Sequence, residues 1–401
     1  MERVAPEKQG FCAERLRRIG EVMGRYVDEG KLPGIATLIA RRGQIVHLET
    51  QGWANVEAQE PLAEDAIYRI YSMTKPLTCV AALMLFEEGR FLLDDPIGSY
   101  LPELGEMQVL REMHNGEPVL SPPRSPVTVR HLMTHTAGMT YGSFEPDSPG
   151  ERMYGEAALM RPDRSLAEMV DCLGGLPLLF DPGTRWLYSI SIDVIGRLVE
   201  VLSGQTLDVY MQERILEPLG MVDSGFCTPP GAADRLAMLY SIGEDGNLEV
   251  TDAPCGRDHT RLDPFCAGGA GLVSTITDYA RFAQMLANGG ELDDARVLSP
   301  HTVAMMGANH LPAALCPFGE PPALGCGFGL GVSVVQDPAA AGLLNGPGSF
   351  GWSGLANTNY WVDPANETLG VIMMQFIQPP TFPGYPTTQQ FRNLVYQALV
   401  S

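Results

Sequence analysis

A serine and a lysine with the right spacing for acyl-transfer chemistry stand in the tetrapeptide Ser72-Met-Thr-Lys75. Residues 67–71 have strand character, and residues 72–88 are predicted to form a helix that is apolar nearly all round and therefore buried. Side chains three apart on a helix share a face, so the hydroxyl and the amine can meet. An apolar environment disfavours the charged form of a lysine and makes its amine a usable base. The unpaired N–H groups at the helix start favour a developing oxyanion.

Lysine is scarce in this chain, which gives Lys75 additional weight. Of 27 basic side chains, only Lys8, Lys31 and Lys75 are lysines. Arginine keeps its proton in a protein, whereas a buried lysine can lose it. The alternative is a purely structural Ser-x-x-Lys, since this tetrapeptide often occurs by chance. Pro76 is expected to kink the helix, because it lies beyond the first helical positions.

Several motifs give the chain a resemblance to a known family. The string Ser-Met-Thr-Lys-Pro at 72–76 resembles the nucleophile motif of family VIII carboxylesterases, relatives of class C β-lactamases and D-alanyl-D-alanine carboxypeptidases. His-Leu-Met-Thr-His-Thr-Ala-Gly-Met at 131–139 resembles the loop that precedes the family's tyrosine motif. Gly-Gly-Ala-Gly-Leu-Val-Ser-Thr at 268–275, followed by Asp-Tyr-Ala-Arg-Phe at 278–282, resembles a later signature. The resemblance covers most of the chain and implies a β-lactamase-like fold.

The resemblance places Tyr188, in Tyr188-Ser189, at the position of the family's catalytic tyrosine. An unaided phenol is a poor base at neutral pH. Beside Lys75, however, the two groups would titrate together and share a proton, so that Tyr188 takes the serine proton and returns it to the leaving alcohol. Without the resemblance, a half-buried aromatic residue on a short strand would be the preferred interpretation.

Trp352-Ser353-Gly354 stands where the lactamases have Lys-Thr-Gly. These residues are predicted to lie on a strand at the border of the cleft and to contact substrate, with Gly354 allowing the backbone to approach it. The resemblance also implies an oxyanion hole made by the amides of Ser72 and Leu355. The alternative for Trp352 is an ordinary core tryptophan.

Two further residues are candidates for the substrate pocket. Asp193, five residues after the tyrosine, resembles an acidic residue that the esterases keep near the site. Its alternative role is the N-cap of a helix that begins at Val194. Tyr141 follows the 131–139 loop and would line the acyl pocket, unless it is a plain loop residue.

The departures from the lactamase pattern concern the substrate. Apolar Trp352 replaces a lysine that would hold a substrate carboxylate, and Ile190 replaces an asparagine amide. Both changes remove polar contacts that a β-lactam or a peptide would use, and both favour a small uncharged ester. The expected function is therefore a serine carboxylesterase acting on small, short-chain acyl esters. A β-lactamase or D-amino peptidase, an acyltransferase and a non-catalytic binding homologue remain as alternatives.

The order of predicted elements indicates an α/β (α+β) fold in which an antiparallel sheet flanked by helices receives an inserted, mostly helical lobe. We expect an α/β domain built from residues 1–94 and 265–401, with the lobe at 95–264 carrying Tyr188. The predicted elements are helices at 12–29, 166–173, 193–202, 207–215 and 387–400, a hairpin at 35–50, strands at 271–274, 328–335, 359–363 and 369–376, and surface loops at 117–127 and 141–165.

Composition excludes several other functions. The net charge of −21 argues against nucleic-acid binding and disfavours anionic membranes. The chain has no apolar start of the secretory kind, and its longest nearly apolar stretch, 79–86, is too short to span a bilayer. Eight scattered cysteines are typical of reduced thiols, which predicts a cytoplasmic location. His131 and His135 lack a third ligand at zinc spacing, so neither a metal nor a cofactor is expected. The oligomeric state cannot be predicted.

Overall fold

A nine-stranded sheet collects strands from both ends of the chain in the computed structural model, which describes residues 1–145, 147–319, 321–379, 382 and 384–401. The strand order is β1-β3-β2-β17-β16-β15-β14-β13, with β4 paired to β3, and all pairs are antiparallel except β1 with β3. The strands are β1 (Glu2–Arg3), β2 (Gly34–Arg41), β3 (Gln44–Asn55), β4 (Glu60–Pro61), β13 (Cys326–Phe328), β14 (Ser333–Val335), β15 (Phe350–Ser353), β16 (Asn359–Asp363) and β17 (Thr368–Met373).

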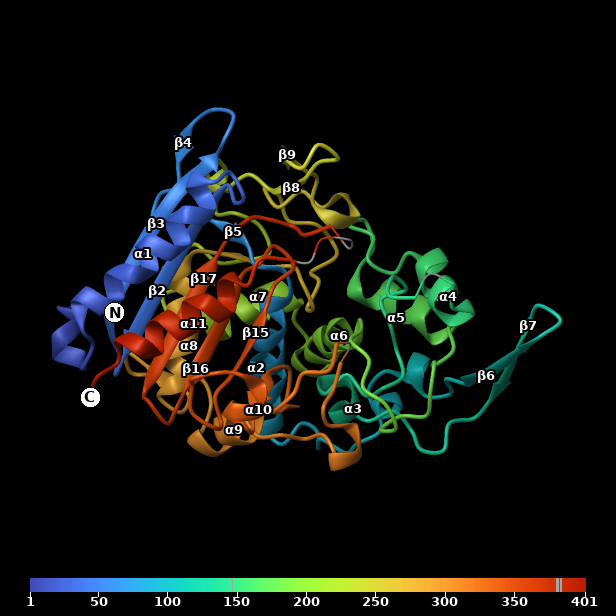
Figure 1. The fold of residues 1–401 in the computed structure, drawn as a ribbon. Coiled ribbons are helices and arrows are strands. Elements are labelled where there is room, and N and C mark those ends of the chain that lie inside the picture. The colour runs from blue at the N-terminus through green and yellow to red at the C-terminus, as the bar shows by residue number, and fades with distance from the viewer. Residues whose placement is uncertain (146, 320, 380–381, 383) are drawn as a thin grey trace.

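Helices cover both faces of this sheet (Figure 1). Alternate residues of β2 point to opposite sides, as strand geometry requires: Ile35 and Ile39 belong to one buried cluster and Leu38 to another. The first cluster contains the apolar stripe of α1 (Ala13–Asp28) and residues of α11 (Thr387–Ala398). On the other face lie α8 (Ile276–Ala287) and α2 (Thr74–Glu87). The predicted α/β architecture is confirmed.

A mostly helical region stands beside the sheet. It contains α3 (Val129–Met133), α4 (Pro149–Ala157), α5 (Leu166–Gly174), α6 (Ser191–Ser203) and α7 (Leu207–Met211), the last followed by a π-helical turn over Gln212–Leu216. A hairpin of β6 (Val109–His114) and β7 (Glu117–Ser121) projects from it (Figure 1). Short pairs join β5 (Tyr68–Arg69) to β10 (Val273–Ser274), β8 (Tyr240–Ile242) to β9 (Leu248–Val250) and β11 (Glu291–Leu292) to β12 (Ala295–Arg296), and α9 (Pro300–Met306) and α10 (Pro338–Ala341) complete the helices of the described residues.

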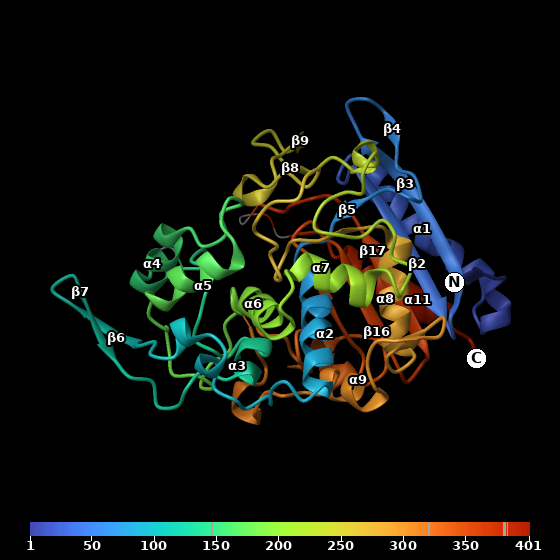
Figure 2. The same ribbon diagram turned by 180° about the vertical axis from the view of Figure 1, so that it is seen from behind.

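Helix α2 runs between the sheet and the helical region (Figure 2). Every residue from Thr74 to Leu85 is buried, as the apolar sequence predicted. A one-turn 3-10 helix, Tyr71–Met73, precedes it. The expected kink at Pro76 is wrong, because Pro76 lies in the first turn of α2, where its missing N–H has no intrahelical partner in any case.

Three other local predictions need correction. The 117–127 loop contains β7, an exposed ribbon strand with no alternating apolar pattern to reveal it. The 141–165 loop contains α4, which begins with Pro149 at its first position; residue 146 lies outside the described residues. The single strand at 328–335 is a hairpin, because the chain turns between β13 and β14 at Gly331, whose φ is +79°.

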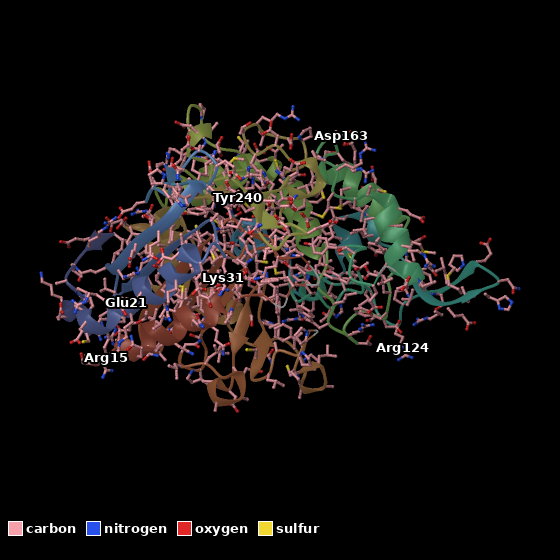
Figure 3. All side chains as sticks on the ribbon, turned by 45° about the horizontal axis from the view of Figure 1, so that its top comes forward. Arg15, Glu21, Lys31, Arg124, Asp163 and Tyr240 are labelled. Carbon is pink, nitrogen blue, oxygen red and sulfur yellow. The ribbon has the colours of Figure 1, made fainter. Side chains whose placement is uncertain are left out.

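Many of the charged residues lie on the surface. Arg15, Glu21 and Asp163 are exposed, and Figure 3 shows them at the periphery of the molecule. Among the helices of the described residues, none combines the length and the apolarity needed to cross a membrane.

Candidate active site

Ser72 lies at the sharp entry to α2. Tyr71, immediately before it, has φ +43°, a left-handed conformation that is unfavourable for a residue with a side chain and is kept only where surrounding structure enforces it. This turn leaves Ser72 partly exposed while Lys75 is fully buried. The Lys75 Nζ donates a hydrogen bond to the Ser72 Oγ at 3.2 Å. The predicted meeting of these two side chains is therefore present.

A backbone carbonyl and two aromatic rings surround the Lys75 amine. It donates a second hydrogen bond to the carbonyl of Gly269 at 2.7 Å. It lies 4.6 Å from the ring centroid of Tyr188 and 5.4 Å from that of Tyr141, within the range of cation–π attraction. Within the described part of the chain, no carboxylate forms an ion pair with it.

The segment around Gly269 is fastened along the start of α2. Thr78 Oγ1 donates to the carbonyl of Gly268 at 2.6 Å, and the Leu272 amide donates to Thr74 Oγ1 at 3.0 Å. A side chain at position 269 would not fit, because its Cβ would lie 2.5 Å from Asp193 Oδ2 and 3.0 Å from the Tyr141 hydroxyl. The glycine thus lets the backbone reach Lys75.

Asp193 holds Gly269 from the other side. Its Oδ1 accepts a hydrogen bond from the Gly269 amide at 2.9 Å, and the side chain is fully buried. Burial raises the pKa of Asp193, while Lys75 and the Gly269 amide act in the opposite direction. The N-cap alternative is wrong, because α6 begins at Ser191 with Ile190 as its N-cap, so that Asp193 lies inside the first turn.

Tyr188 lies in an irregular segment just before α6, and its ring lies beside the Lys75 amine. Its hydroxyl accepts a hydrogen bond from the Trp352 Nε1 at 3.4 Å. Its ring stacks on Trp186 with centroids 6.2 Å apart and packs against His135 at 4.7 Å. Among the hydrogen bonds of the described residues, none joins the Tyr188 hydroxyl to Ser72 or Lys75. The expected proton sharing would need the hydroxyl to approach the pair, as catalytic contacts commonly do when substrate binds.

His135 supports Tyr188 and was not predicted from the sequence. It is fully buried, and its Nδ1 lies 3.2 Å from the Ser189 Oγ. Burial and the nearby Lys75 hold the pKa of His135 well below its usual value, so the ring is neutral. The available signal was its place in the 131–139 motif, which precedes the tyrosine in the chain.

The Leu355 amide is held close to the nucleophile turn by the residues that follow β15. The Gly354 amide donates to the Thr358 carbonyl at 2.7 Å, and Thr358 Oγ1 donates to the Ile70 carbonyl at 3.3 Å. A Cβ on Gly354 would collide with that same Ile70 carbonyl. The Leu355 amide finds no backbone acceptor among the described residues. It is therefore available to a ligand near Ser72.

A cavity of about 430 Å³ opens onto Ser72 and Leu355. Tyr141 lines it, as the sequence predicted, together with Tyr188. Most of the other lining residues had no recognisable signal in the sequence, among them Tyr71, Phe144, Arg257, His259 and Phe265.

The other predicted pocket residues are placed differently. Trp352 contacts Tyr188 and Phe328, and Ser353 is exposed at the end of β15. Neither they nor Gly354 are among the described residues that line the cavity. Ile190 is buried in the core, so the position offers no polar contact to a ligand.

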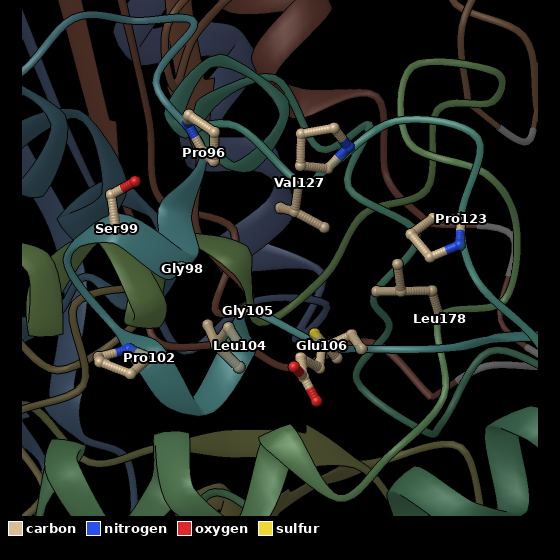
Figure 4. A pocket seen from close by; sticks show the side chains of 12 residues that line it. Pro96, Gly98, Ser99, Pro102, Leu104, Gly105, Glu106, Pro123, Val127 and Leu178 are labelled. Atoms are coloured by element: carbon tan, nitrogen blue, oxygen red, sulfur yellow. The ribbon is translucent and has the colours of Figure 1, made fainter.

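Of two further cavities, one adjoins the Ser72 cavity and the other is separate from it. One of about 430 Å³ shares Phe144 and Tyr188 with the Ser72 cavity and is otherwise lined by residues such as Trp186, Leu315 and Phe318. The other, about 410 Å³, lies in the helical region between prolines and small residues, including Pro96, Ser99, Pro102 and Leu178 (Figure 4). It shares no residue with the Ser72 cavity.

The two histidines that were considered as metal ligands have structural roles. The His131 Nδ1 accepts a hydrogen bond from the Thr128 amide and so caps α3, while His135 packs on Tyr188. Within the described ranges, no group of three or more His, Cys, Asp or Glu side chains is arranged to hold a metal ion.

Comparisons with known proteins agree with this geometry. The model of the family described as Beta-lactamase matches residues 19–389. Esterase EstB of Burkholderia gladioli is 31% identical, with 96% of each chain covered. The solved structure of EstCE1, described as a hydrolase with promiscuous acyltransferase activity, superposes with a TM-score of 0.79 at 27% identity and covers 96% of this chain and 99% of its own. Simvastatin synthase from Aspergillus terreus gives a TM-score of 0.81 at 26% identity, covering 96% of this chain and 98% of its own.

These matches extend over nearly the whole chain, so they include the sheet, α2 and the helical region. They confirm the resemblance that the motifs indicated, and they show that this chain belongs to the beta-lactamase family.

Proposed function

We propose that this chain is a serine carboxylesterase that hydrolyses small, short-chain acyl esters through an acyl-enzyme on Ser72. The observation that carries the proposal is the 3.2 Å contact between the Lys75 Nζ and the Ser72 Oγ, made by a fully buried lysine. The similarity to Esterase EstB supports the choice of an ester as substrate.

The reaction proceeds in two steps. The neutral Lys75 amine takes the proton of the Ser72 hydroxyl as Oγ bonds to the ester carbonyl carbon, and the carbonyl electron pair moves onto oxygen. The amides of Ser72 and Leu355 donate hydrogen bonds to this oxyanion. Tyr188 gives a proton to the departing alkoxide and regains one from the Lys75 ammonium. Water then attacks the acyl carbon and gives a proton to the same pair, which passes a proton to the Ser72 Oγ as the acyl–oxygen bond breaks, so that the acid and free Ser72 are formed.

Two positions near the site favour an ester over a β-lactam or a D-amino peptide, which the same catalytic residues would otherwise serve. Trp352 turns its indole N–H towards Tyr188, and Ile190 is buried, so neither position supplies a polar anchor for those substrates. Comparing the turnover of p-nitrophenyl butyrate with that of a chromogenic cephalosporin tests this choice. We expect the ester to be the better substrate by kcat/KM, and the opposite order would reverse the assignment.

Acyl transfer to an alcohol is a second candidate. The two cavities that meet at Phe144 and Tyr188 offer separate room for an acyl group and an acceptor. The similarity to simvastatin synthase points the same way. Product analysis with an added short alcohol distinguishes the two activities, because transfer gives a new ester whereas hydrolysis gives only the acid.

Labelling with a fluorophosphonate probe tests the nucleophile directly. We expect one equivalent of probe on Ser72, and Ser72→Ala should abolish both labelling and ester hydrolysis. Label on another residue, or full activity of Ser72→Ala, would contradict the proposal, and an unlabelled, inactive wild-type protein would favour a non-catalytic binding homologue. A cytoplasmic location stays a prediction from the cysteine pattern.

A further inference from the structure

Arg257 and His259 contribute unsatisfied polar atoms to the wall of the cavity that holds Ser72. The Arg257 Nη2 is shielded from solvent and makes no hydrogen bond with any described residue, and the ring nitrogens of His259 are shielded without a side-chain partner among these residues. Both side chains line the same cavity as Ser72 and Leu355, and His259 is only 2% exposed. Buried polar groups are nearly always hydrogen-bonded in folded proteins, so unsatisfied atoms on side chains that line a cavity indicate a partner that the chain itself does not supply.

The Arg257 guanidinium has no ion-pair partner within the described part of the chain. The carboxylic acids that interact electrostatically with Arg257 are Asp263 and Asp193. Asp193 accepts a hydrogen bond from Gly269, and Asp263 lies 3.6 Å from the Nε of Arg261. A guanidinium remains charged in a protein, so Arg257 brings a positive charge without an ion-pair partner to the cavity that holds Ser72. An anion of the right size would remove that cost.

His259 and Tyr71 extend this positive site with neutral donors. Burial, with the guanidinium groups of Arg257 and Arg69 close by, lowers the pKa of His259 to about 3. The ring is therefore neutral near pH 7 and carries one N–H donor. The Tyr71 ring lies 6.3 Å from it, and the Tyr71 hydroxyl is likewise buried without a partner among the described residues. Arg257, His259 and Tyr71 thus bring hydrogen-bond donors to one wall of the cavity, and such a set complements an ionised carboxylate.

We propose that Arg257, with His259 and Tyr71, forms a subsite for a carboxylate of the substrate, so that the preferred esters carry a free carboxylate on the acyl chain. This inference rests on the proposed esterase function and names its substrate class. It revises the expectation of an uncharged ester, which came from Trp352 and Ile190 alone. The anionic end is bound by the 254–259 loop, whose residues the sequence motifs do not include.

A pair of substrates of equal chain length tests the subsite. Mono-p-nitrophenyl adipate and p-nitrophenyl hexanoate differ only in the terminal carboxylate. We expect the wild-type protein to prefer the adipate ester by kcat/KM, and Arg257→Gln to lower the adipate-to-hexanoate ratio by about tenfold to a hundredfold, the range for a hydrogen bond to a charged group.

Arg261→Gln is the matched control, because it removes the same charge from the same loop. Arg261 has a side chain that is 71% exposed and does not line the cavity. The ratio should stay at its wild-type value in this variant. An unchanged ratio in Arg257→Gln, an equal fall in both variants, or a wild-type preference for the hexanoate ester would overturn the subsite and leave the esterase proposal standing.

A binding measurement separates the subsite from catalysis. Adipate should bind to wild-type protein and to Ser72→Ala in calorimetry, and Arg257→Gln should weaken this binding by at least about tenfold. If neither ester is hydrolysed, the esterase proposal fails, and Arg257-dependent adipate binding would still support the subsite. If adipate does not bind, or if inorganic phosphate binds more tightly than adipate, the assignment to a carboxylate is wrong.

Discussion

The Asp193 carboxylate accepts a hydrogen bond from the amide of Gly269 at 2.9 Å, and the carbonyl of the same glycine accepts one from the Lys75 Nζ at 2.7 Å. One glycine therefore connects a buried acid to the proposed base. Because Asp193 does not contact Ser72, we regard it as a positioning residue that acts through Gly269. The structure gives this acid a task that its place in the sequence does not indicate.

Replacing Asp193 should separate positioning from charge. Asp193→Ala removes the acceptor of the Gly269 amide, and we expect kcat to fall by about a hundredfold, because small displacements of a catalytic group cost that much. Asp193→Asn keeps an oxygen for that amide and should retain most of the activity. Steady-state kinetics on p-nitrophenyl butyrate, with the thermal midpoint as a fold control, measure the difference. Equal losses in the two variants would show that the charge, and not the hydrogen bond, is what matters.

Gly354→Ala should damage the proposed oxyanion hole. The added methyl group would collide with the Ile70 carbonyl and the Thr358 hydroxyl, which together fix the turn that carries the Leu355 amide. Losing one oxyanion donor typically costs about 10²–10³ in kcat, and we expect a loss of this order. Single-turnover measurement of acylation checks it.

Gly175→Ala is the control for a glycine substitution as such. Position 175 has a negative φ of −83°, and an added Cβ would meet only an ordinary contact at 3.5 Å, with the Cys172 carbonyl. This variant should keep wild-type kinetics. A Gly354→Ala protein that acylates at the wild-type rate would remove Leu355 from the mechanism.

Local patterns explain which parts of the molecule could be predicted. The contact of Ser72 with Lys75 follows from helical periodicity alone. The 35–50 hairpin and the turn between β16 and β17 can be predicted from the residue types in their turns. Tyr188 came from the resemblance. The contact of its hydroxyl with Trp352 depends on two segments 164 residues apart, which no local pattern specifies.

The remaining site residues belong to loops and long-range contacts. Asp193 and Gly269 are 76 residues apart, and Arg257 and His259 lie in a stretch without apolar periodicity. Such residues are brought together by tertiary packing, and their own sequence context carries no signal for it. The division of the chain into domains at residues 94 and 264 stays a prediction.

His47 should make the fold sensitive to acid. Burial lowers the pKa of His47 to about 4, and its Nε2 lies 2.8 Å from the Thr37 Oγ1. Between pH 6.5 and about 4, His47 is protonated in the unfolded chain but stays neutral in the folded protein. The free energy of unfolding therefore falls as the pH decreases through this window. The difference between 6.5 and about 4 corresponds to at most about 3 kcal/mol, since the Glu49 carboxylate, 4.0 Å from the same Nε2, favours the protonated ring.

Denaturant unfolding at a series of pH values checks this expectation. His47→Gln should flatten the slope of stability against pH between 6.5 and 4, whereas replacing the exposed His301 by Gln should leave it unchanged. If the His47→Gln protein keeps the full slope, other groups dominate the acid response.

Tyr188→Phe should reveal its role through the leaving group. If Tyr188 protonates the departing alcohol, its loss should lower kcat/KM for ethyl butyrate by about 10²–10⁴. The loss should be much smaller for p-nitrophenyl butyrate, because nitrophenolate departs without a proton. Both esters give the same butyryl-enzyme, and kcat/KM reports acylation, so a difference between them arises at the leaving-group step.

Tyr141→Phe provides the comparison, since Tyr141 is a second phenol beside Lys75, at 5.4 Å from ring centroid to Nζ. Any loss in this variant should be the same for the two esters, because no step assigned to Tyr141 involves the leaving oxygen. A Tyr188→Phe protein that loses equal activity on both esters would limit Tyr188 to activation of Ser72. The proton for the alcohol would then have to come from the Lys75 ammonium, which already lies 3.2 Å from the Ser72 Oγ.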